Sequence, residues 1–564
     1  MTHDTPPRND ADTSSSSGTQ RSRDDADSST SKSSNSTHAP RHLILGAMFR
    51  ALGAYPSGWR QPGAHHDPAD DGTIIRQVAK LAEDARLDYL FFGDWLATGH
   101  DLEYRDPYLL ARIEPVSAIT FAAGITERIG LIATANTTYS DPYTLARSTA
   151  SVDILSGGRA GLNLVTGAEP RAAGNHGRDA HQGNADRYDR AEEFVGALRS
   201  LWDSFEDDAF VGDQDGGVLI DPTKLHRSDI VGRTLRVTGP LNAARPPQGH
   251  LPIVNAGTSP RSRELVAAHA DLALVAVPTL QAGIELRASL RADAAANGRD
   301  PDALKVISPI LPVVAETTEE AWAIVDRLLD GIPVDDRDPA DTAGSTRAPL
   351  PDAFPTNRTI AALAETVGAD LAGRRLADVV TDADLAGFSD AGRRLVALVG
   401  ERTGRVVAPV QGQERPGNDD ESAAIDDDTT ANAPSSPSGH RFVTFRHLLV
   451  TSVVPAAIVA GDAVTVADHF ERWFRAGAVD GFNVLTAFQP AQFEAFTGLL
   501  VPELQRRGLF RTEYSGHTLR EHLGLERPEN VHVRAAASRA AEAASEAAES
   551  ALHTSDDRVP QTVS

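Results

Sequence analysis

The stretch "TASVDILSGGRAGLNLVTG", residues 149–167, decides the fold class. Its first half has the apolar spacing of a helix and stops at Gly157 and Gly158, and its second half is a short apolar run over residues 160–165. Glycine just past a helix supplies the left-handed backbone that ends it. The pattern therefore predicts a helix, a tight turn and a buried strand that ends at Thr166 and Gly167.

The same alternation continues along the chain. Amphipathic helical patterns separate most of eight strand-like apolar runs, which cover residues 43–49, 88–94, 129–135, 160–166, 251–257, 271–277, 306–314 and 481–487. Apolar strands that alternate with helices indicate a parallel sheet covered by helices. Eight strands suit an α/β fold of the (β/α)8 TIM-barrel type with insertions. An open doubly wound sheet is the alternative, but "LILGAMFRALGAYP" (43–56) lacks its GxGxxG turn.

Composition divides the chain into segments. Residues 1–40 are rich in Ser, Asp and Thr and predict a disordered tail. The barrel domain is expected over residues 41–530, with an insertion at about 333–449 in which 411–440 is acidic and disordered. Residues 531–564 are expected to be a disordered or Ala-rich tail.

The bulk properties exclude several classes of function. The formal net charge of -25 argues against a nucleic-acid partner, and the absence of cysteine excludes disulfides and thiolate chemistry. No apolar run reaches the roughly 20 residues of a membrane span, so we expect a cytoplasmic protein without membrane contact. The sequence contains no HExxH, Walker or GxSxG pattern, and we therefore expect no metal site, hydrolase or NTPase.

Polar residues at strand ends are the candidate site, because TIM barrels carry their chemistry at the carboxyl ends of the strands. Four predicted strands end this way, with Asp94, Thr134 to Asn136, Asn163, and Asn255 to Ser259. Any one of these residues could simply cap a turn, but four together favour a polar ligand. Ser259 and Pro260 form a good helix start, which either binds an anion such as phosphate or simply caps a surface helix.

Tyr188 lies in the predicted helix "NADRYDRAEEF" (184–194), away from its apolar stripe. This position allows Tyr188 to stack on a ring or to hydrogen-bond to one, and the alternative is an ordinary half-exposed tyrosine.

Several longer motifs occur together in one order. They are "GWRQP" (58–62), "DYLFFGDW" (88–95), "TTYSDPYTLARSTASVDILSGGRAGLNLVT" (137–166), "DRYDRAEEFVGALRSLWDSFEDDAF" (186–210), "GPLNAARPPQGHLPIVNAGTSPRSRELVAA" (239–268), "DGFNVL" (480–485) and "VPELQRRGLFRTEYSGHTLREHLGL" (501–525). Over about residues 41–332 and 450–526 the chain resembles the nitrilotriacetate/dibenzothiophene-sulfone/pristinamycin-type monooxygenases (component A). These belong to the bacterial luciferase-like superfamily.

The resemblance implies a luciferase-like TIM barrel and an FMN-dependent monooxygenase, the oxygenase component of a two-component system. In that family a separate NAD(P)H-dependent flavin reductase supplies FMNH2, and O2 gives a flavin hydroperoxide that oxidises a small organic substrate. The resemblance places Asp94, Thr134, Asn184, Tyr188 and Ser259 at cofactor-binding positions. It also implies a homo-oligomer, and it assigns no catalytic residue.

The chain departs from the family pattern at two places. Ala54 and Tyr55 stand where the family commonly has histidines, and Asn184 stands where it often has one. Asparagine donates hydrogen bonds but does not act as an acid or base near neutral pH. Two alternatives therefore stay open: a deazaflavin-dependent oxidoreductase of the same superfamily, or a flavin-binding protein without turnover.

The sequence leaves the substrate open. Arg60 and Arg171 are candidate contacts for an anionic substrate, and the alternative for Arg60 is a structural pairing with a neighbouring acid. Loops 168–185 and 210–245 are expected to cover the barrel mouth.

Overall fold

The computed structural model describes residues 42–98, 112–332, 334, 359–409, 441–451 and 456–556. Eight parallel strands close into a barrel: β1 (Ile44–Phe49), β2 (Tyr89–Phe92), β3 (Gly130–Asn136), β4 (Ala160–Val165), β9 (Ile253–Ala256), β10 (Leu272–Leu274), β11 (Lys305–Val314) and β13 (Gly481–Leu485). Closure comes from the pairing of β10 with β11, of β11 with β13, and of β13 with β1. The predicted TIM barrel is confirmed. No barrel strand extends more than one residue beyond its predicted run, and β2, β9, β10 and β13 are two to four residues shorter than predicted.

A ninth strand, β12 (Ala457–Gly461), was not predicted from the sequence. The strand β11 is long enough to pair with three strands: Lys305–Ile307 pair with β10, Ile307–Ile310 with β13 and Ile310–Val314 with β12. β12 therefore extends the sheet outside the barrel. Its sequence, "AIVAG", is short, and three of its five residues are alanine or glycine, so it carries little strand signal.

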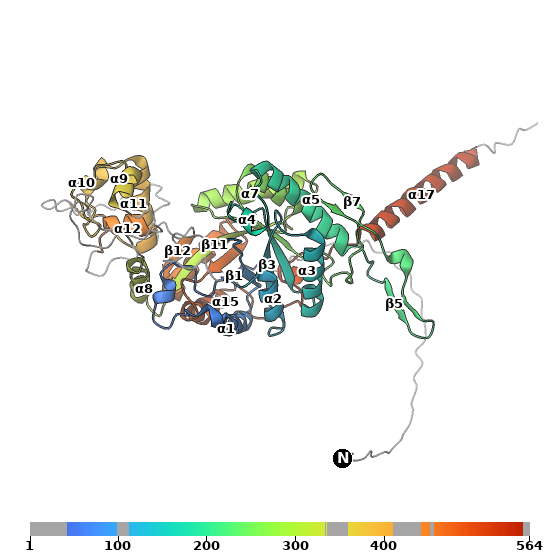
Figure 1. The fold of residues 1–564 in the computed structure, drawn as a ribbon, viewed down its shortest axis with the longest axis horizontal. Helices are drawn as coiled ribbons and strands as arrows, with labels where there is room; N and C mark the ends of the chain where they lie inside the picture. Colours follow the sequence, from blue (N-terminus) through green and yellow to red (C-terminus); the bar gives the residue numbers. More distant parts are fainter. Residues whose placement is uncertain are drawn as a thin grey trace, which may run out of the picture. The chain divides into compact units, whose positions relative to one another are not determined.

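Helices cover the outside of the barrel. Figure 1 shows α1 (Asp71–Asp84), α2 (Pro115–Ala123), α3 (Pro142–Ser156) and α5 (Asn184–Trp202) around β1 and β3. The remaining helices outside the insertion are α4 (Ala172–Asn175), α6 (Pro260–His269), α7 (Leu280–Ala296), α8 (Thr318–Asp330), α13 (Ala463–Arg475), α14 (Ala491–Ala495), α15 (Val501–Arg506), α16 (Leu519–His522) and α17 (Val531–Asp556). Two short hairpins, β5 (Phe210–Asp213) with β6 (Val218–Ile220) and β7 (Ile230–Val231) with β8 (Arg236–Val237), lie between α5 and β9.

The predicted turn between α3 and β4 is confirmed. Gly157 has φ 69°, and its N–H is bonded to the carbonyls of Asp153 and Ile154. Gly158 has φ 94°, and a Cβ there would lie 2.7 Å from Thr518 Cγ2. The first glycine therefore ends the helix, and the second lets the C-terminal segment pack closely.

The amino-terminal end of the barrel is filled by side chains from the C-terminal part of the chain. Leu519, Leu523 and Leu525 pack in one apolar cluster with inward-facing residues of the strands, which include Ile44, Tyr89, Ile132, Val254, Leu272 and Ile307. The backbone N–H of Leu519 also bonds to the Gly158 carbonyl at 3.0 Å. The barrel interior is therefore a packed core at this end, and the opposite end is left for a site.

The described part of the 333–449 insertion is helical. It forms α9 (Ile360–Val367), α10 (Asp382–Gly387) and α11 (Asp390–Thr403), and α12 (Phe445–Val450) follows at its end. These helices gather in one cluster in Figure 1 and share a core that contains Leu363, Val367, Val396, Val399, Phe445 and Leu448. The segments 1–40 and 411–440, for which disorder is predicted, lie outside the described residues. Most of the predicted C-terminal tail is the helix α17.

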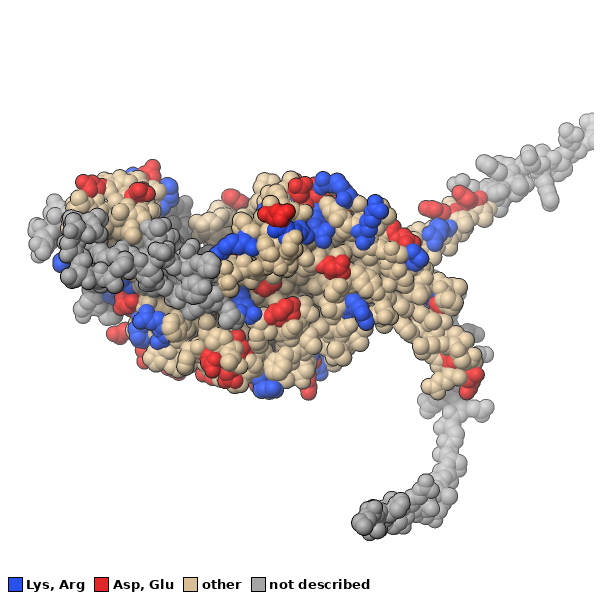
Figure 2. Space-filling model, viewed as in Figure 1, with Lys and Arg blue, Asp and Glu red and all other residues tan. Residues whose placement is uncertain are grey.

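Acidic and basic side chains are interspersed on the face of the molecule that Figure 2 displays. None of the described helices combines the length and the apolar character that a bilayer crossing requires.

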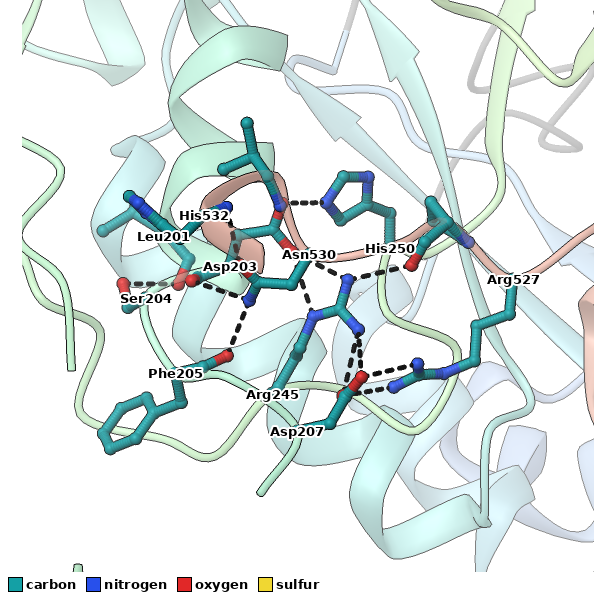
Figure 3. A network of polar contacts seen from close by, with 12 residues as sticks. Leu201, Asp203, Ser204, Phe205, Asp207, Arg245, His250, Arg527, Asn530 and His532 are labelled. Atoms are coloured by element: carbon teal, nitrogen blue, oxygen red, sulfur yellow. Dashed lines mark hydrogen bonds and ion pairs between the residues drawn. The ribbon is translucent and has the colours of Figure 1, made fainter. Parts of the chain in front are cut away.

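A buried polar network holds the segment that precedes α17 (Figure 3). Arg245 Nε donates to Asp203 Oδ1 at 3.0 Å, and both side chains are 2% exposed. Asp207 accepts from both Arg245 and Arg527, and Asn530 Nδ2 donates to the carbonyls of Asp203 and Phe205. The network ties the end of α5 to residues 527–530.

Candidate active site

A cavity of about 440 Å³ opens at the carboxyl ends of the strands. Six strands contribute to its wall, with Met48, Phe91, Thr134, Asn163, Asn255 and Leu274 among the lining residues. We call this space the mouth cavity. Its position is the one at which TIM-barrel enzymes place their catalytic groups, and its size suits a small ligand.

Three of the five residues that the resemblance selected line the mouth cavity, namely Asp94, Thr134 and Tyr188. The other two lie outside its lining. Asn184 is exposed at the first position of α5, one turn before Tyr188. Ser259 is also exposed, and its Oγ accepts the Ser262 N–H at 3.3 Å as the N-cap of α6, three residues beyond the lining residue Ala256.

Thr134 and Asn163 form a buried polar pair in the cavity wall. Asn163 Nδ2 donates to Thr134 Oγ1 at 3.0 Å. Asn163 is 4% exposed and Thr134 is 5% exposed. Asn163 Oδ1 has no hydrogen-bond partner among the described residues. A buried carbonyl oxygen of this kind is costly unless something donates to it, so the site fits a ligand with an N–H group.

Asp94 follows β2 and is half-buried in the same wall. Its Oδ1 accepts the Trp95 N–H at 2.8 Å. Burial raises the pKa of Asp94 above its usual value, and the Trp95 N–H and the positive charge of Arg112 offset part of that rise. The carboxyl group thus stands beside a cation at the end of its strand.

Gly167, shortly after β4, has no room for a side chain. It has φ 69°, and a Cβ there would lie 2.3 Å from Asn136 Nδ2. Asn136 Oδ1 in turn accepts the Thr138 N–H at 2.9 Å. Any side chain at residue 167 would therefore disturb Asn136, and both residues line the mouth cavity.

One of the two loops expected to cover the mouth does so. Ala168, Glu169 and Ala172 belong to the cavity wall. The loop is held by the Tyr139 hydroxyl, which lies 2.6 Å from His181 Nδ1, and by stacking of the Tyr139 ring on His176 with centroids 4.5 Å apart.

The expectation for loop 210–245 is wrong, because it supplies none of the described residues that line the cavity. This loop packs along α5 instead, where Glu193 accepts the backbone N–H groups of Arg233 and Thr234.

The residues chosen from sequence as contacts for an anion have other partners. Arg60 Nη1 donates to the Gly331 carbonyl at 2.6 Å, and Arg171 pairs with Glu169 at 2.8 and 2.9 Å. Among the described residues, the arginines that line the mouth cavity are Arg50 and Arg112. Arg50 directly follows β1, so the strand-end rule could have found it, whereas no local signal marked Arg112. Ala54 and Tyr55, at the family's histidine positions, are buried at 2% and 1% exposure.

Residues 55–393 match the family of luciferase-like monooxygenases. The chain belongs to this family. It is 34% identical to nitrilotriacetate monooxygenase component A of Aminobacter aminovorans, over 87% of this chain and 98% of that protein. It is 33% identical to N-acetyl-S-(2-succino)cysteine monooxygenase of Bacillus subtilis (strain 168), over 88% and 100%. Among solved structures, EDTA monooxygenase from Chelativorans sp. BNC1 superposes with a TM-score of 0.63 at 27% identity and covers 87% of this chain and 100% of that one.

These relatives confirm the resemblance seen in the motifs and make the chain a monooxygenase. They support a flavin as its cofactor. The relative from Aminobacter aminovorans is named as one component of its enzyme, and another relative, at 30% identity, is named as one of the subunits of pristinamycin IIA synthase.

Proposed function

We propose that this luciferase-like monooxygenase is the oxygenase component of a two-component system that uses reduced FMN. A separate NAD(P)H-dependent flavin reductase delivers FMNH2, and substrate, O2 and FMNH2 are converted to oxygenated substrate, water and FMN. The observation that carries the proposal is the convergence of Asp94, Thr134, Asn163 and Tyr188 on one cavity at the mouth of the family's barrel. A cytoplasmic location, where NAD(P)H is available, and a homo-oligomeric state complete the proposal.

The residues of the mouth cavity fit a flavin. Asn163 Oδ1 would accept a ring N–H, and Met48, Phe91 and Leu274 supply apolar surface for the ring system. Tyr188 and Asp94 would contact its polar edge. Ser259 and the N-terminus of α6 would hold the phosphate, because the first N–H groups of a helix and its dipole favour an anion. Asn184, at the start of α5, would donate an amide hydrogen bond to the cofactor.

When bound, reduced FMN supplies the electrons that activate O2. The chain's own tasks are to orient the ring, to exclude water and to place the substrate beside it. Loop 168–185 is positioned to exclude water, because its first residues form part of the cavity wall. No acid–base role is proposed for Asn184.

Anaerobic equilibrium titration tests the cofactor assignment. We expect the wild-type chain to bind reduced FMN, and Asn163→Leu, which removes the Oδ1 acceptor at similar volume, to bind about tenfold more weakly. The matched control is Asn242→Leu, the same change at an exposed residue outside the cavity lining. Wild-type protein that binds a reduced deazaflavin but not reduced FMN would overturn the proposal.

A further inference from the structure

Asn483 is a buried amide in the middle of β13. The residue is 0% exposed, and neither its Oδ1 nor its Nδ2 has a hydrogen-bond partner among the described residues. An unpaired carboxamide in a protein interior costs free energy on both its donor and its acceptor. A leucine of similar size would avoid that cost. The amide therefore points to a polar partner that is not part of the chain.

The side chain of Asn483 points into the barrel. Side chains alternate between the two faces of a strand. The preceding residue, Phe482, packs against a helix on the outside of the barrel, because its ring lies 4.4 Å between centroids from that of Phe470 in α13. Val484 belongs to the same apolar cluster. Asn483, between the two, consequently faces the interior.

Strand pairing sets the height of Asn483 in the barrel. Asn483 pairs with Gly46 on β1, and β1 pairs in turn with β2. The strands of a (β/α)8 barrel are staggered by about one residue per strand around the ring. With this stagger, the pairings place Phe91 on β2, Asn163 on β4 and Leu274 on β10 level with Asn483. These four strands alternate around the barrel, as the strands that supply one interior layer do.

This layer forms the floor of the mouth cavity. Phe91, Asn163 and Leu274 line the cavity, and Asn483 completes the layer from the strand opposite Asn163. Beneath the layer, the interior is filled by the apolar cluster at the amino-terminal end of the barrel. Asn483 itself is fully buried and is not among the lining residues, so whatever pairs with it must be small.

The two amides of this layer face each other across the barrel axis. Asn163 Oδ1, like both polar atoms of Asn483, has no hydrogen-bond partner among the described residues. The other two side chains of the layer, Phe91 and Leu274, offer no hydrogen bond. Water is small enough for such a place, and buried water typically pairs with polar groups that are otherwise unsatisfied.

We infer that Asn163 and Asn483 hold buried water between them, and that Asn483 is a positioning residue that acts on the bound flavin ring through this water. A water-mediated hydrogen bond is nearly as favourable as a direct one. The carbonyl oxygen of Asn163 has two acceptor sites, so it can accept from the water and from a ring N–H together. The positioning role rests on the proposed function, because it needs a flavin above the floor.

Substitution of Asn483 separates this role from a purely structural one. Asn483→Leu replaces the amide by an apolar group of similar volume, so we expect the flavin-free variant to unfold at the temperature of the wild type or above it. We expect it to bind reduced FMN about fivefold more weakly in anaerobic titration, because the water loses its partner. Asn483→Ser keeps a hydroxyl and leaves room for water, and it should recover part of the affinity.

The matched control is Asn530→Leu, the same change at a buried asparagine that has partners in the chain. Asn530 is 1% exposed and donates to the carbonyls of Asp203 and Phe205. We expect this variant to unfold at a lower temperature and, while folded, to bind reduced FMN like the wild type. A crystal structure of the flavin-free wild type should show ordered water within hydrogen-bond distance of both Asn163 and Asn483.

Three results would overturn the inference. The first is a dry space between Asn163 and Asn483 in that crystal structure. The second is wild-type affinity for reduced FMN in Asn483→Leu, or in Asn483→Ser if the leucine variant does not fold. The third is that Asn483→Leu behaves like Asn530→Leu, with lower stability and unchanged affinity, which would make Asn483 structural. Failure of the wild type to bind reduced FMN is a distinct outcome: it would remove the proposed function and the positioning role, and the water between the amides would still be decided by the crystal structure.

Discussion

Ser259 allows a test of the phosphate position without disturbing the fold. Aspartate caps helices as well as serine does, so Ser259→Asp preserves the start of α6 but adds a negative charge there. We expect affinity for reduced FMN to fall about tenfold, because the new carboxylate repels the phosphate. The matched control is Ser389→Asp, the same substitution at the N-cap of α11 in the insertion, where Ser389 Oγ accepts the Gly392 N–H at 3.2 Å. Equal FMN affinity in all three proteins would remove Ser259 from the phosphate site.

His469 makes the fold sensitive to acid. It packs between Trp473 and Phe482, and burial, together with the charge of Arg472, lowers its pKa to about 3. The folded chain therefore keeps His469 neutral where the unfolded chain protonates it. Its contribution to stability is present above pH 6.5 and is lost as the pH falls towards 3.

His469→Phe keeps a ring in this position and removes the titration. We expect the free energy of unfolding of the variant to fall less steeply between pH 6 and pH 4, by up to about 1.4 kcal/mol per pH unit. Urea unfolding at several pH values measures the difference. Burial raises the pKa of Asp88 and of Asp153 to about 6, so their contribution to the free energy of unfolding changes with pH in the opposite direction to that of His469. Both carboxyl groups are present in the variant and in the wild type, and their effects therefore cancel in the comparison. Parallel pH profiles would show that His469 does not titrate between the two states.

At the scale of elements, the turn between α3 and β4 offers a matched pair of substitutions. Gly157→Ala places a Cβ in open space at φ 69°. We therefore expect the free energy of unfolding to fall by about 1 kcal/mol, which is the cost of a left-handed backbone at a residue other than glycine. Gly158→Ala adds a contact of 2.7 Å with Thr518 Cγ2 to the same kind of backbone cost, and we expect it to be clearly more destabilising. Chemical denaturation of both variants measures the difference. Equal losses would mean that Thr518 moves aside without cost.

The elements also show what could be predicted from the sequence. Each barrel strand was identified because it is an apolar run between helices, and Asp94, Thr134 and Asn163 were found because each lies at or near the end of such a run. Arg112 could not be found in this way, since it lies shortly before α2 and not at the end of a strand. β12 was missed because its pairing depends on the extra length of β11, which no local pattern reveals.

At the scale of the whole molecule, the C-terminal region has two parts: residues 519–525 contribute to the barrel core, and α17 does not. Leu519, Leu523 and Leu525 fill the barrel's amino-terminal end, whereas residues 531–547 of α17 are exposed or half-buried. We expect a chain that ends at residue 537 to unfold at the same temperature as the full chain. A chain that ends at residue 516 should not fold, because it loses the side chains that close the barrel. A large loss of thermal stability in the longer truncation would show that α17 supports the barrel.

We propose that the mouth of this barrel binds reduced FMN for reaction with O2. The most direct measurement is anaerobic titration of the protein with reduced FMN, followed by admission of O2 while absorbance and O2 uptake are recorded. We expect saturable binding, and we expect the bound flavin to be reoxidised more slowly than free reduced FMN because the cavity excludes water and shields the ring. Absence of binding, or reoxidation at the rate of the free flavin, would contradict it.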